Sequence, residues 1–344
     1  MVEATDLSTF VGSQIDFSWN GKLNLGLRNN NYYSNGYAYH SLEPRISYLQ
    51  PISPKSSIKF SYSRMSQPVQ RLTNPGLGLP QDIILSSGKE IKPQLADHLS
   101  IEFAKNFQIT EEQFSFSFQP FYKNLKNIIS FRDGYDTRSL MYGSIYQASG
   151  YNEVITSGAG EIFGIEMMLE KSTGKLNGWV NYTVLKATNT FSDLNQGYSF
   201  SPAQDRRHSF NVVANWQVTK KWNVGLSWMF ISGQPVNVPE SVFVPFKPDY
   251  GNGGMMIEPS SNFLFDQGTR GNYRMKPFHK LDITAMYKFK LLGLDAIWNV
   301  GAYNVYNRMN PSFYYIGKSE GAQPVLKSVS LFPIMPSSSL SIKF

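Results

Sequence analysis

Apolar and polar residues alternate along most of this chain, and this alternation restricts the possible folds more than any other feature. In the stretch 11–19, the residues on one side are apolar, namely Val11, Ile15, Phe17 and Trp19. The residues between them are polar, namely Gln14, Asp16 and Ser18. Because successive side chains of a β-strand point to opposite faces, the pattern predicts a strand with one apolar and one polar face.

The same pattern recurs to the end of the chain, where Leu340, Ile342 and Phe344 alternate with polar residues. Counting back from Phe344 predicts about 13 strands. The first turn is Asn20-Gly21, a dipeptide typical of tight hairpins. Short turns are predicted near residues 20–21, 51–55, 109–112, 172–175, 219–221 and 290–293. Long connections are predicted at residues 30–41, 69–95, 133–160, 188–205, 233–277 and 313–327.

Short turns at one end of the strands and long connections at the other are typical of outer-membrane β-barrels. The composition agrees with this class, since 15% of the residues are aromatic, 17% are charged and the mean hydropathy is -0.30. No window of the sequence approaches the roughly 20 apolar residues of a membrane-spanning helix. The sequence therefore predicts an all-β fold, an antiparallel transmembrane β-barrel in the bacterial outer membrane.

A soluble β-sandwich is the alternative explanation of such alternation. It would have to bury many apolar aromatic faces in one dry core. The unequal lengths of the connections disfavour it, and so do the aromatic residues near strand ends, where a membrane barrel meets the two bilayer interfaces. These residues are Trp19, Tyr48, Tyr62, Trp222 and Trp298.

The net charge of +7 raises the question of a nucleic-acid partner. The basic residues are scattered, however, and the longest runs are the pairs Arg206-Arg207 and Lys220-Lys221. Nucleic-acid-binding proteins concentrate their charge on one face or arm, so we expect no nucleic-acid partner. A basic surface suits anionic outer-membrane lipid or lipopolysaccharide instead. Cysteine is absent, which excludes disulfides and thiolate metal sites.

Catalytic signatures are missing from the sequence. It contains no nucleophile elbow, phosphate-binding loop or zinc-protease motif. The histidines at positions 40, 98, 208 and 279 lie far apart, near predicted strand ends. The segment 193–197 resembles the start of a calcium loop but lacks its terminal glutamate. We therefore predict no enzyme activity, no metal site and no cofactor.

Tyrosines in the long connections are the candidate substrate-binding residues. The segment 135–151 carries several of them, and their rings could stack on a sugar or a peptide. The alternative is that the rings pack the connection against its neighbours. The candidates are Tyr135, Tyr142, Tyr146, Tyr151 and Tyr250.

An odd strand count bears on completeness, because complete single-chain bacterial barrels have an even number of strands. Either one strand is missed, or the chain is the C-terminal part of a larger barrel. The first residues, MVEATDLSTF, have neither the basic nor the apolar region of a signal peptide. This favours the second explanation, in which a leader and further strands lie upstream.

Several stretches together resemble the C-terminal barrel of TonB-dependent outer-membrane transporters, most closely the Bacteroidota type. The resemblance covers essentially the whole chain in the order of the family. Each stretch alone is loosely defined, but the ordered set is specific. The stretches are SLEPRISY (41–48), KFSYSRMSQ (59–67), QDRRHSFNVVANW (204–216), GNYRMKPFHKLDITAMY (271–287), VYNRMNPSFYY (305–315) and LFPIMPSSSLSIKF (331–344).

The resemblance implies a barrel of 22 strands closed by an N-terminal plug, of which residues 1–344 would supply the C-terminal 13 or 14 strands. It implies import of a scarce nutrient with energy from the inner-membrane TonB complex, which acts through the plug. This chain departs from the family in having no plug, TonB box or signal sequence. An upstream segment, in the same chain or another, is expected to complete it. Phe344 resembles the terminal aromatic residue that the outer-membrane assembly machinery recognises.

We therefore expect the barrel of an active transporter for an iron chelate, vitamin, glycan or peptide. One alternative is a smaller passive channel of about 14 strands. Another is a structural or adhesion barrel in a larger envelope complex. A surface lipoprotein is a possible partner in either the transporter or the adhesion hypothesis.

Overall fold

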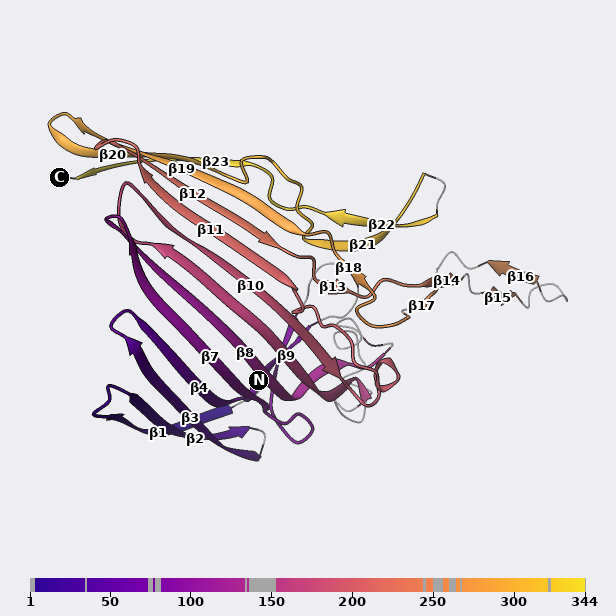
Figure 1. Ribbon diagram of the computed structural model, residues 1–344. Helices are drawn as coiled ribbons and strands as arrows, with labels where there is room; N and C mark the ends of the chain where they lie inside the picture. Colours follow the sequence, from indigo (N-terminus) through magenta and orange to yellow (C-terminus); the bar gives the residue numbers. More distant parts are fainter. Residues whose placement is uncertain are drawn as a thin grey trace.

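The protein is described from a computed structural model, which places thirteen strands in one antiparallel sheet (Figure 1). The described residues are 4–34, 36–73, 77, 82–133, 135, 153–243, 246–249, 256–259, 264–266, 268–320 and 323–343. No helix among them has the length and hydropathy to cross a membrane. The strands of the sheet, in spatial order, are β1 (Ala4–Asp16), β2 (Lys22–Ser34), β3 (Tyr37–Ser53), β4 (Ser56–Gln67), β7 (Gln94–Ile109), β8 (Glu112–Phe131), β9 (Ile155–Lys171), β10 (Leu176–Thr190), β11 (His208–Gln217), β12 (Trp222–Ile231), β19 (Phe278–Leu291), β20 (Leu294–Tyr303) and β23 (Met335–Lys343).

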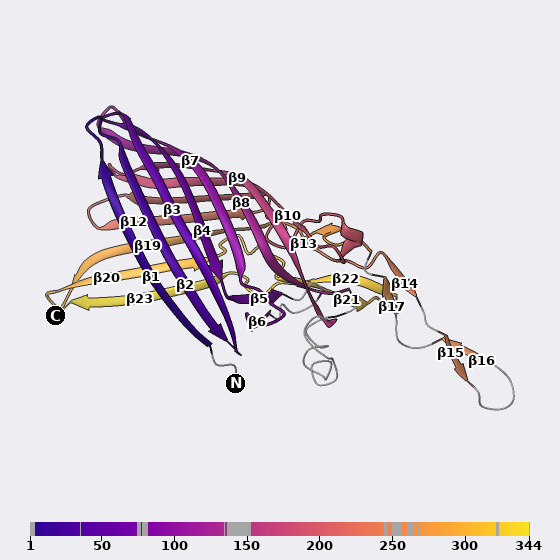
Figure 2. The ribbon, with the colours of Figure 1, turned by 90° about the horizontal axis from the view of Figure 1, so that it is seen from below.

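The sheet curves into an open trough whose edges are β1 and β23 (Figures 1 and 2). Short turns lie at one end, which we call the turn end, and longer connections lie at the other, which we call the loop end. The chain enters β1 at the loop end and leaves β23 at the turn end. The two edge strands therefore run in the same direction. The predicted all-β antiparallel fold is confirmed.

Smaller two-stranded ribbons occupy the loop end (Figure 1). They lie within the predicted long connections after β4, β12 and β20. The ribbons are β5 (Val69–Thr73) with β6 (Asp82–Ser86), β13 (Pro235–Val236) with β18 (Tyr273–Arg274), β14 (Ser241–Phe243) with β17 (Leu264–Asp266), β15 (Phe246–Asp249) with β16 (Met256–Pro259), and β21 (Phe313–Lys318) with β22 (Pro324–Val329). A short 3-10 turn, η2 (Asn195–Gly197), lies between β10 and β11.

The register of the ladders gives the sheet one apolar and one polar face. Directly paired residues of neighbouring antiparallel strands share a face. One such row is apolar and consists of Ile15, Leu23, Tyr48, Phe60 and Ile101. The adjacent row is polar and consists of Gln14, Asn24, Ser47, Ser61 and Ser100. The predicted alternation of faces is thus confirmed.

The apolar face is uncovered in the structure. The side chains of Phe60 and Ile101 are each 47% exposed, and Phe163 is 57% exposed. Aromatic residues cluster at the turn end of this face, where the Trp19 indole N–H donates to the Tyr48 hydroxyl at 3.2 Å. The rings of Trp222 and Tyr287 lie 4.6 Å apart in the same region. Such a face requires an apolar environment around the sheet.

The short turns lie where the sequence predicts them, but one predicted long connection is wrong. Residues 30–41 are mostly strand, because β2 and β3 continue to a tight turn next to Gly36. Asn30 pairs with Ser41 and Tyr32 pairs with Tyr39 in this extension. The asparagines suggested a loop, but pairing between the strands outweighs that local preference.

The strands β3 and β4 separate towards the loop end. Their ladder ends at the pair of Arg45 and Ser63, although both strands continue beyond it. Pro44, the next residue of β3, has no N–H to donate. The carboxylate of the fully buried Glu43 bridges the gap, because it accepts hydrogen bonds from the N–H (3.1 Å) and the hydroxyl (2.6 Å) of Ser66. A side chain thus replaces the main-chain ladder here.

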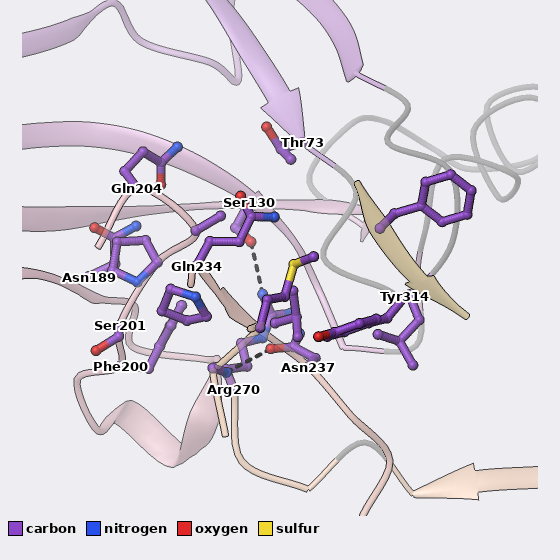
Figure 3. Close-up of a pocket in the computed structure, with 18 of the residues that line it drawn as sticks. Thr73, Ser130, Asn189, Phe200, Ser201, Gln204, Gln234, Asn237, Arg270 and Tyr314 are labelled. Carbon is purple, nitrogen blue, oxygen red and sulfur yellow. Dashed lines mark hydrogen bonds between the residues drawn. The ribbon is translucent and has the colours of Figure 1, made fainter. Parts of the chain in front are cut away.

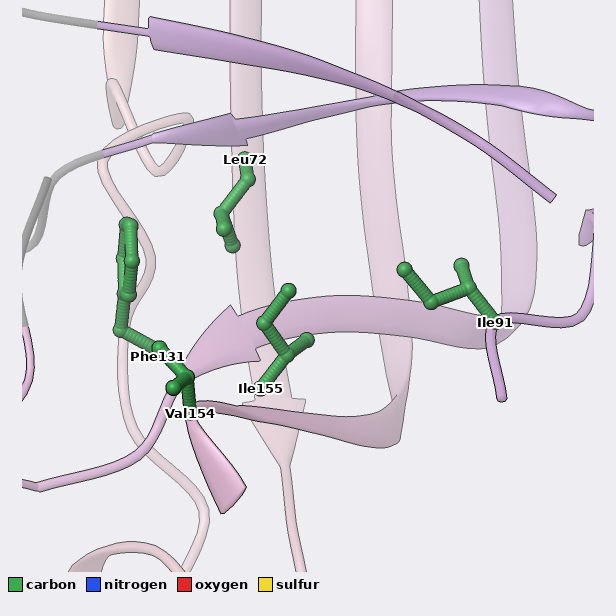
Figure 4. Packing of buried hydrophobic residues seen from close by; sticks show 5 residues of the cluster. All are labelled: Leu72, Ile91, Phe131, Val154 and Ile155. Carbon is green, nitrogen blue, oxygen red and sulfur yellow. The ribbon is translucent and has the colours of Figure 1, made fainter. Parts of the chain in front are cut away.

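A small hydrophobic cluster anchors the β5–β6 ribbon to the loop end of the sheet (Figure 4). Leu72 of β5 packs against the end of β8 and the start of β9, and both Leu72 and Phe131 are fully buried. The buried members of the cluster are Leu72, Ile91, Phe131, Val154 and Ile155. The ribbon is therefore a packed part of the fold.

Candidate ligand-binding site at the loop end

A cavity of about 210 Å³, which we call the rim pocket, lies at the loop end (Figure 3). Its walls come from β5, the end of β8, the β10–β11 and β12–β19 connections, and the start of β21. These segments are far apart in sequence and meet only because the sheet brings their strands together. The lining residues include Arg71, Asn189, Gln234, Asn237, Arg270 and Tyr314.

Asp205 holds the base of two of these connections together. Its side chain is fully buried and accepts hydrogen bonds from the N–H of Ala187 (2.9 Å), from Arg207 (2.9 Å) and from Arg274. Burial acts to raise the pKa of this carboxyl, but the three donors outweigh it and the pKa lies below its ordinary value. Asp205 therefore stays ionised and fixes the β10–β11 connection to β18.

Arg270, in the β12–β19 connection, contacts the end of β8, the segment that follows it and the β10–β11 connection. Its guanidinium, only 8% exposed, donates to Ser130 (2.9 Å), to the carbonyl oxygen of Phe131 (2.8 Å) and to Asp133 (2.7 Å). Its plane also lies over the ring of Phe200 at 5.7 Å, a cation-π contact. Connections after β8, β10 and β12 thus converge on one side chain (Figure 3).

Two amide groups of the pocket have fixed orientations. The Oε1 of Gln234 accepts a hydrogen bond from Arg206 (2.8 Å), and the Oδ1 of Asn237 accepts one from the N–H of Gly271 (2.7 Å). Gly271 has φ +68°, and a Cβ there would lie 2.6 Å from the carbonyl oxygen of Ser201. This position therefore requires glycine.

Both cations of the lining are paired. Arg71 lies 3.5 Å from Asp82, and Arg270 lies 2.7 Å from Asp133. No aspartate or glutamate of the described residues lines the pocket. Among the described residues, the lining and its ionic partners therefore have no net charge, and the remaining polar side chains are amides and hydroxyls.

A metal site is absent from the described part of the chain, where no group of histidine and carboxylate side chains could hold an ion. Asp193, at the start of the segment that resembled a calcium loop, contacts Arg132 and accepts a hydrogen bond from Thr156 at 2.7 Å. Its carboxylate therefore ties the β10–β11 connection to β9.

The sequence matches the model of a known protein family. The model of the family described as "TonB dependent receptor-like, beta-barrel" matches residues 2–307. The chain belongs to this family. TonB-dependent receptor barrels are proteins of the outer membrane of Gram-negative bacteria. Curated protein sequences contain no significant match to the chain.

Solved structures of TonB-dependent receptors share this fold. The ferric-catecholate import receptor Fiu of E. coli K12 has a TM-score of 0.60 and 14% identity, over 100% of this chain and 45% of its own. The ferric preacinetobactin receptor BauA of Acinetobacter baumannii has a TM-score of 0.60 and 14% sequence identity, and the match covers 100% of this chain and 43% of BauA. The ferripyoverdine receptor of Pseudomonas aeruginosa has a TM-score of 0.59 and 11% sequence identity, and the match covers 98% of this chain and 38% of the receptor.

The chain thus spans less than half the length of these TonB-dependent receptors. The family and the solved structures are receptors and transporters rather than enzymes. The structures come from E. coli, Acinetobacter and Pseudomonas, and the likeness to the Bacteroidota type stays a prediction.

One of the predicted binding residues of this TonB-dependent receptor barrel is placed by the structure. Tyr135 packs against the cluster around Leu72 and Phe131. This position agrees with a packing role, and a role in ligand stacking stays a prediction. Four other candidates, Tyr142, Tyr146, Tyr151 and Tyr250, lie outside the described residues, as does the predicted assembly signal Phe344.

Sequence reasoning missed the groups that shape the rim pocket. Gln234 and Asn237 lie in a connection that was treated as a single long loop. The stretches QDRRHSF and GNYRMKPF carried a usable signal, because charged residues next to strand ends often anchor connections. In the structure these stretches meet through Asp205 and Arg274.

Proposed function

We propose that this chain is the barrel wall of an active transporter that imports a nutrient across the outer membrane with energy from the TonB complex. The observation that carries the proposal is a pocket of about 210 Å³ at the loop end of a barrel of this family. The loop end would face outside, where nutrients are captured. Solved relatives include proteins named as an import receptor and a ferric citrate transporter.

Completion of the barrel is part of this proposal. Within the described residues, neither β1 nor β23 has a partner on its outer side, and both run towards the turn end. Direct pairing between them would be parallel, so an antiparallel barrel needs an odd number of further strands. We propose that an upstream segment supplies those strands, nine for a barrel of about 22, together with a plug.

The proposed plug would fill the lumen lined by the polar face. Unpaired edges in lipid cost several kcal/mol for each backbone group, so the completing segment is needed for insertion as well as for gating. TonB would act through the plug, and the rim pocket would hold the nutrient above it. Contacts with lipopolysaccharide or a surface lipoprotein stay predictions.

Uptake measurements in the native bacterium test this function. Deleting the gene is expected to abolish high-affinity uptake of one nutrient class and to leave other uptake unchanged. Deleting TonB is expected to abolish the same uptake while surface binding persists, because capture needs no energy. Collapse of the proton gradient should act in the same way.

The alternatives give different results. A passive channel of about 14 strands would keep its flux without TonB. A structural or adhesion barrel would show no nutrient phenotype, and its loss would change surface assembly or attachment. Either result would reject the transporter proposal.

A further inference from the structure

We propose that the rim pocket binds a neutral oligosaccharide. The inference rests on the proposed import function and names the substrate class of that site. It differs from the ferric chelates named for several solved relatives. The pocket leaves several hydrogen-bonding groups available, and its described cations are already paired with carboxylates.

The pocket presents fixed donors. The oxygens of Gln234 and Asn237 already accept hydrogen bonds from Arg206 and from the N–H of Gly271. An amide whose oxygen is held in this way directs its NH₂ group elsewhere, and these NH₂ groups donate to no partner among the described residues. The Tyr314 hydroxyl accepts from the N–H of Lys276 at 3.0 Å, so its own proton is left to donate.

Other polar groups around these donors can both donate and accept. The side chains of Asn189, Ser201 and Gln204 line the same pocket and have no hydrogen-bond partner within the described chain (Figure 3). A ligand with many oxygens and some hydroxyl protons would satisfy both sets of groups. Sugar hydroxyls accept and donate, while ring and glycosidic oxygens only accept.

Charge separates a sugar from an anionic ferric chelate. An anionic chelate needs uncompensated cations, but Arg270 is engaged by Asp133 and Arg71 lies 3.5 Å from Asp82. An anion would have to displace a carboxylate from one of these pairs. A neutral ligand leaves both pairs intact.

The balance of donors separates a sugar from an uncharged peptide. A peptide backbone offers as many N–H donors as carbonyl acceptors. Asn189, Ser201 and Gln204 can accept as well as donate, but Gln234, Asn237 and Tyr314 add only donors, so the described lining has more donors than a peptide's equal numbers of N–H and C=O groups would match. A sugar, which is richer in acceptors, matches the excess of donors.

Two substitutions change this property with little change in shape. In Gln234→Glu and Asn237→Asp, an oxygen still accepts from Arg206 and from Gly271, but the free NH₂ becomes a second, anionic acceptor. The control is Asn24→Asp, which makes the same change on the polar face of β2, at the turn end. All three are made in the full-length protein, purified from outer membranes.

Binding is measured by calorimetry with maltohexaose, cellohexaose and mannohexaose, and with ferric citrate, a ferric trihydroxamate and hexaalanine. We expect at least one hexaose to bind. The Gln234→Glu/Asn237→Asp variant should bind it roughly tenfold or more weakly, as expected for lost hydrogen bonds in a pocket, and Asn24→Asp should bind normally.

Each other result overturns the inference. Binding of a ferric chelate or of hexaalanine in place of the sugars would show a different ligand class. Failure of every hexaose to bind, or sugar binding that the double variant leaves unchanged, would show that the rim pocket is not a sugar site. TonB-dependent uptake of a chelate would still support the transporter, whereas uptake independent of TonB would reject the transporter itself.

Discussion

The guanidinium of Arg274 contacts the buried carboxylate of Asp205, and this ion pair joins the β10–β11 connection to β18. The two residues belong to separate sequence stretches that resemble the TonB-dependent family. Their contact anchors the β10–β11 and β12–β19 connections, which form much of the rim pocket. The shape of the pocket therefore depends on the charges of Asp205 and Arg274, which do not themselves line it.

Replacing Asp205 by Asn should destabilise this end of the barrel. Arg207 and Arg274, whose side chains are 36% and 39% exposed, would lose the charged acceptor of their hydrogen bonds, at a cost of about 1 to 3 kcal/mol. The thermal midpoint, compared at one scan rate, should fall. Asp295→Asn is the control, since the Lys290–Asp295 pair is exposed and worth less than about 1 kcal/mol. Equal midpoints for both variants would contradict this role.

Acid should remove the contribution of Asp205. Because the pKa of its carboxyl is lowered in the folded protein, its stabilising effect is complete above the ordinary value of 3.8. The effect is lost as the pH falls through the lower pKa of the folded state. The thermal midpoint of the native protein should therefore approach that of Asp205→Asn in this acid range. A constant difference between the two midpoints across the range would refute the assignment.

Arg270→Lys should uncouple the connections after β8 and β12. A lysine has one ammonium group and cannot reach Ser130, Phe131 and Asp133 together as the planar guanidinium does. Hydrogen exchange should become about tenfold faster in residues 130–133, while the strands of the sheet keep their protection. Arg71→Lys is the control, because the Arg71 side chain is 63% exposed. Unchanged exchange in Arg270→Lys would argue against this coupling role of Arg270.

Glu43 should be needed to hold β3 and β4 together beyond their ladder. Glu43→Ala leaves the N–H of Ser66 without its acceptor, at a cost of about 1 to 3 kcal/mol, so exchange of this amide should accelerate tenfold or more. Glu43→Gln keeps the acceptor oxygen and should exchange nearly normally. Fast exchange in both variants would mean that the charge next to Arg28, rather than the hydrogen bond, closes the gap.

The faces and turns of the sheet were accessible to sequence reasoning because they are local properties. Alternation assigned Phe60 and Ser61 to opposite faces, and Asn20 adopts the left-handed conformation, φ 63°, that its turn requires. The strand extension around Asn30 was missed because only its pairing with Ser41 makes it a strand.

The rim pocket was not accessible in the same way. Gln234 and Asn237 acquire their role from contacts with Arg206 and Gly271, and those contacts exist only after the β12–β19 connection has folded and met the β10–β11 connection. Tyrosine content drew attention to Tyr135, yet the structure places its ring on a hydrophobic cluster. Composition indicates which residues could bind, but the register of distant strands decides which of them share a cavity.

The most direct test of the barrel account measures the surroundings of two neighbouring residues. Residues 1–344 contain no cysteine, so Phe60→Cys and Ser61→Cys can each carry a single nitroxide in the full-length protein once every cysteine of the upstream segment is replaced by serine. The labelled protein is reconstituted in a lipid bilayer. The account predicts that the label at position 60 collides mainly with oxygen dissolved in lipid. The label at position 61 should collide more with a water-soluble nickel chelate if the lumen contains water. If a plug shields position 61, neither oxygen nor the nickel chelate should reach its label. Equal access of the nickel chelate to both positions would contradict a membrane-spanning barrel.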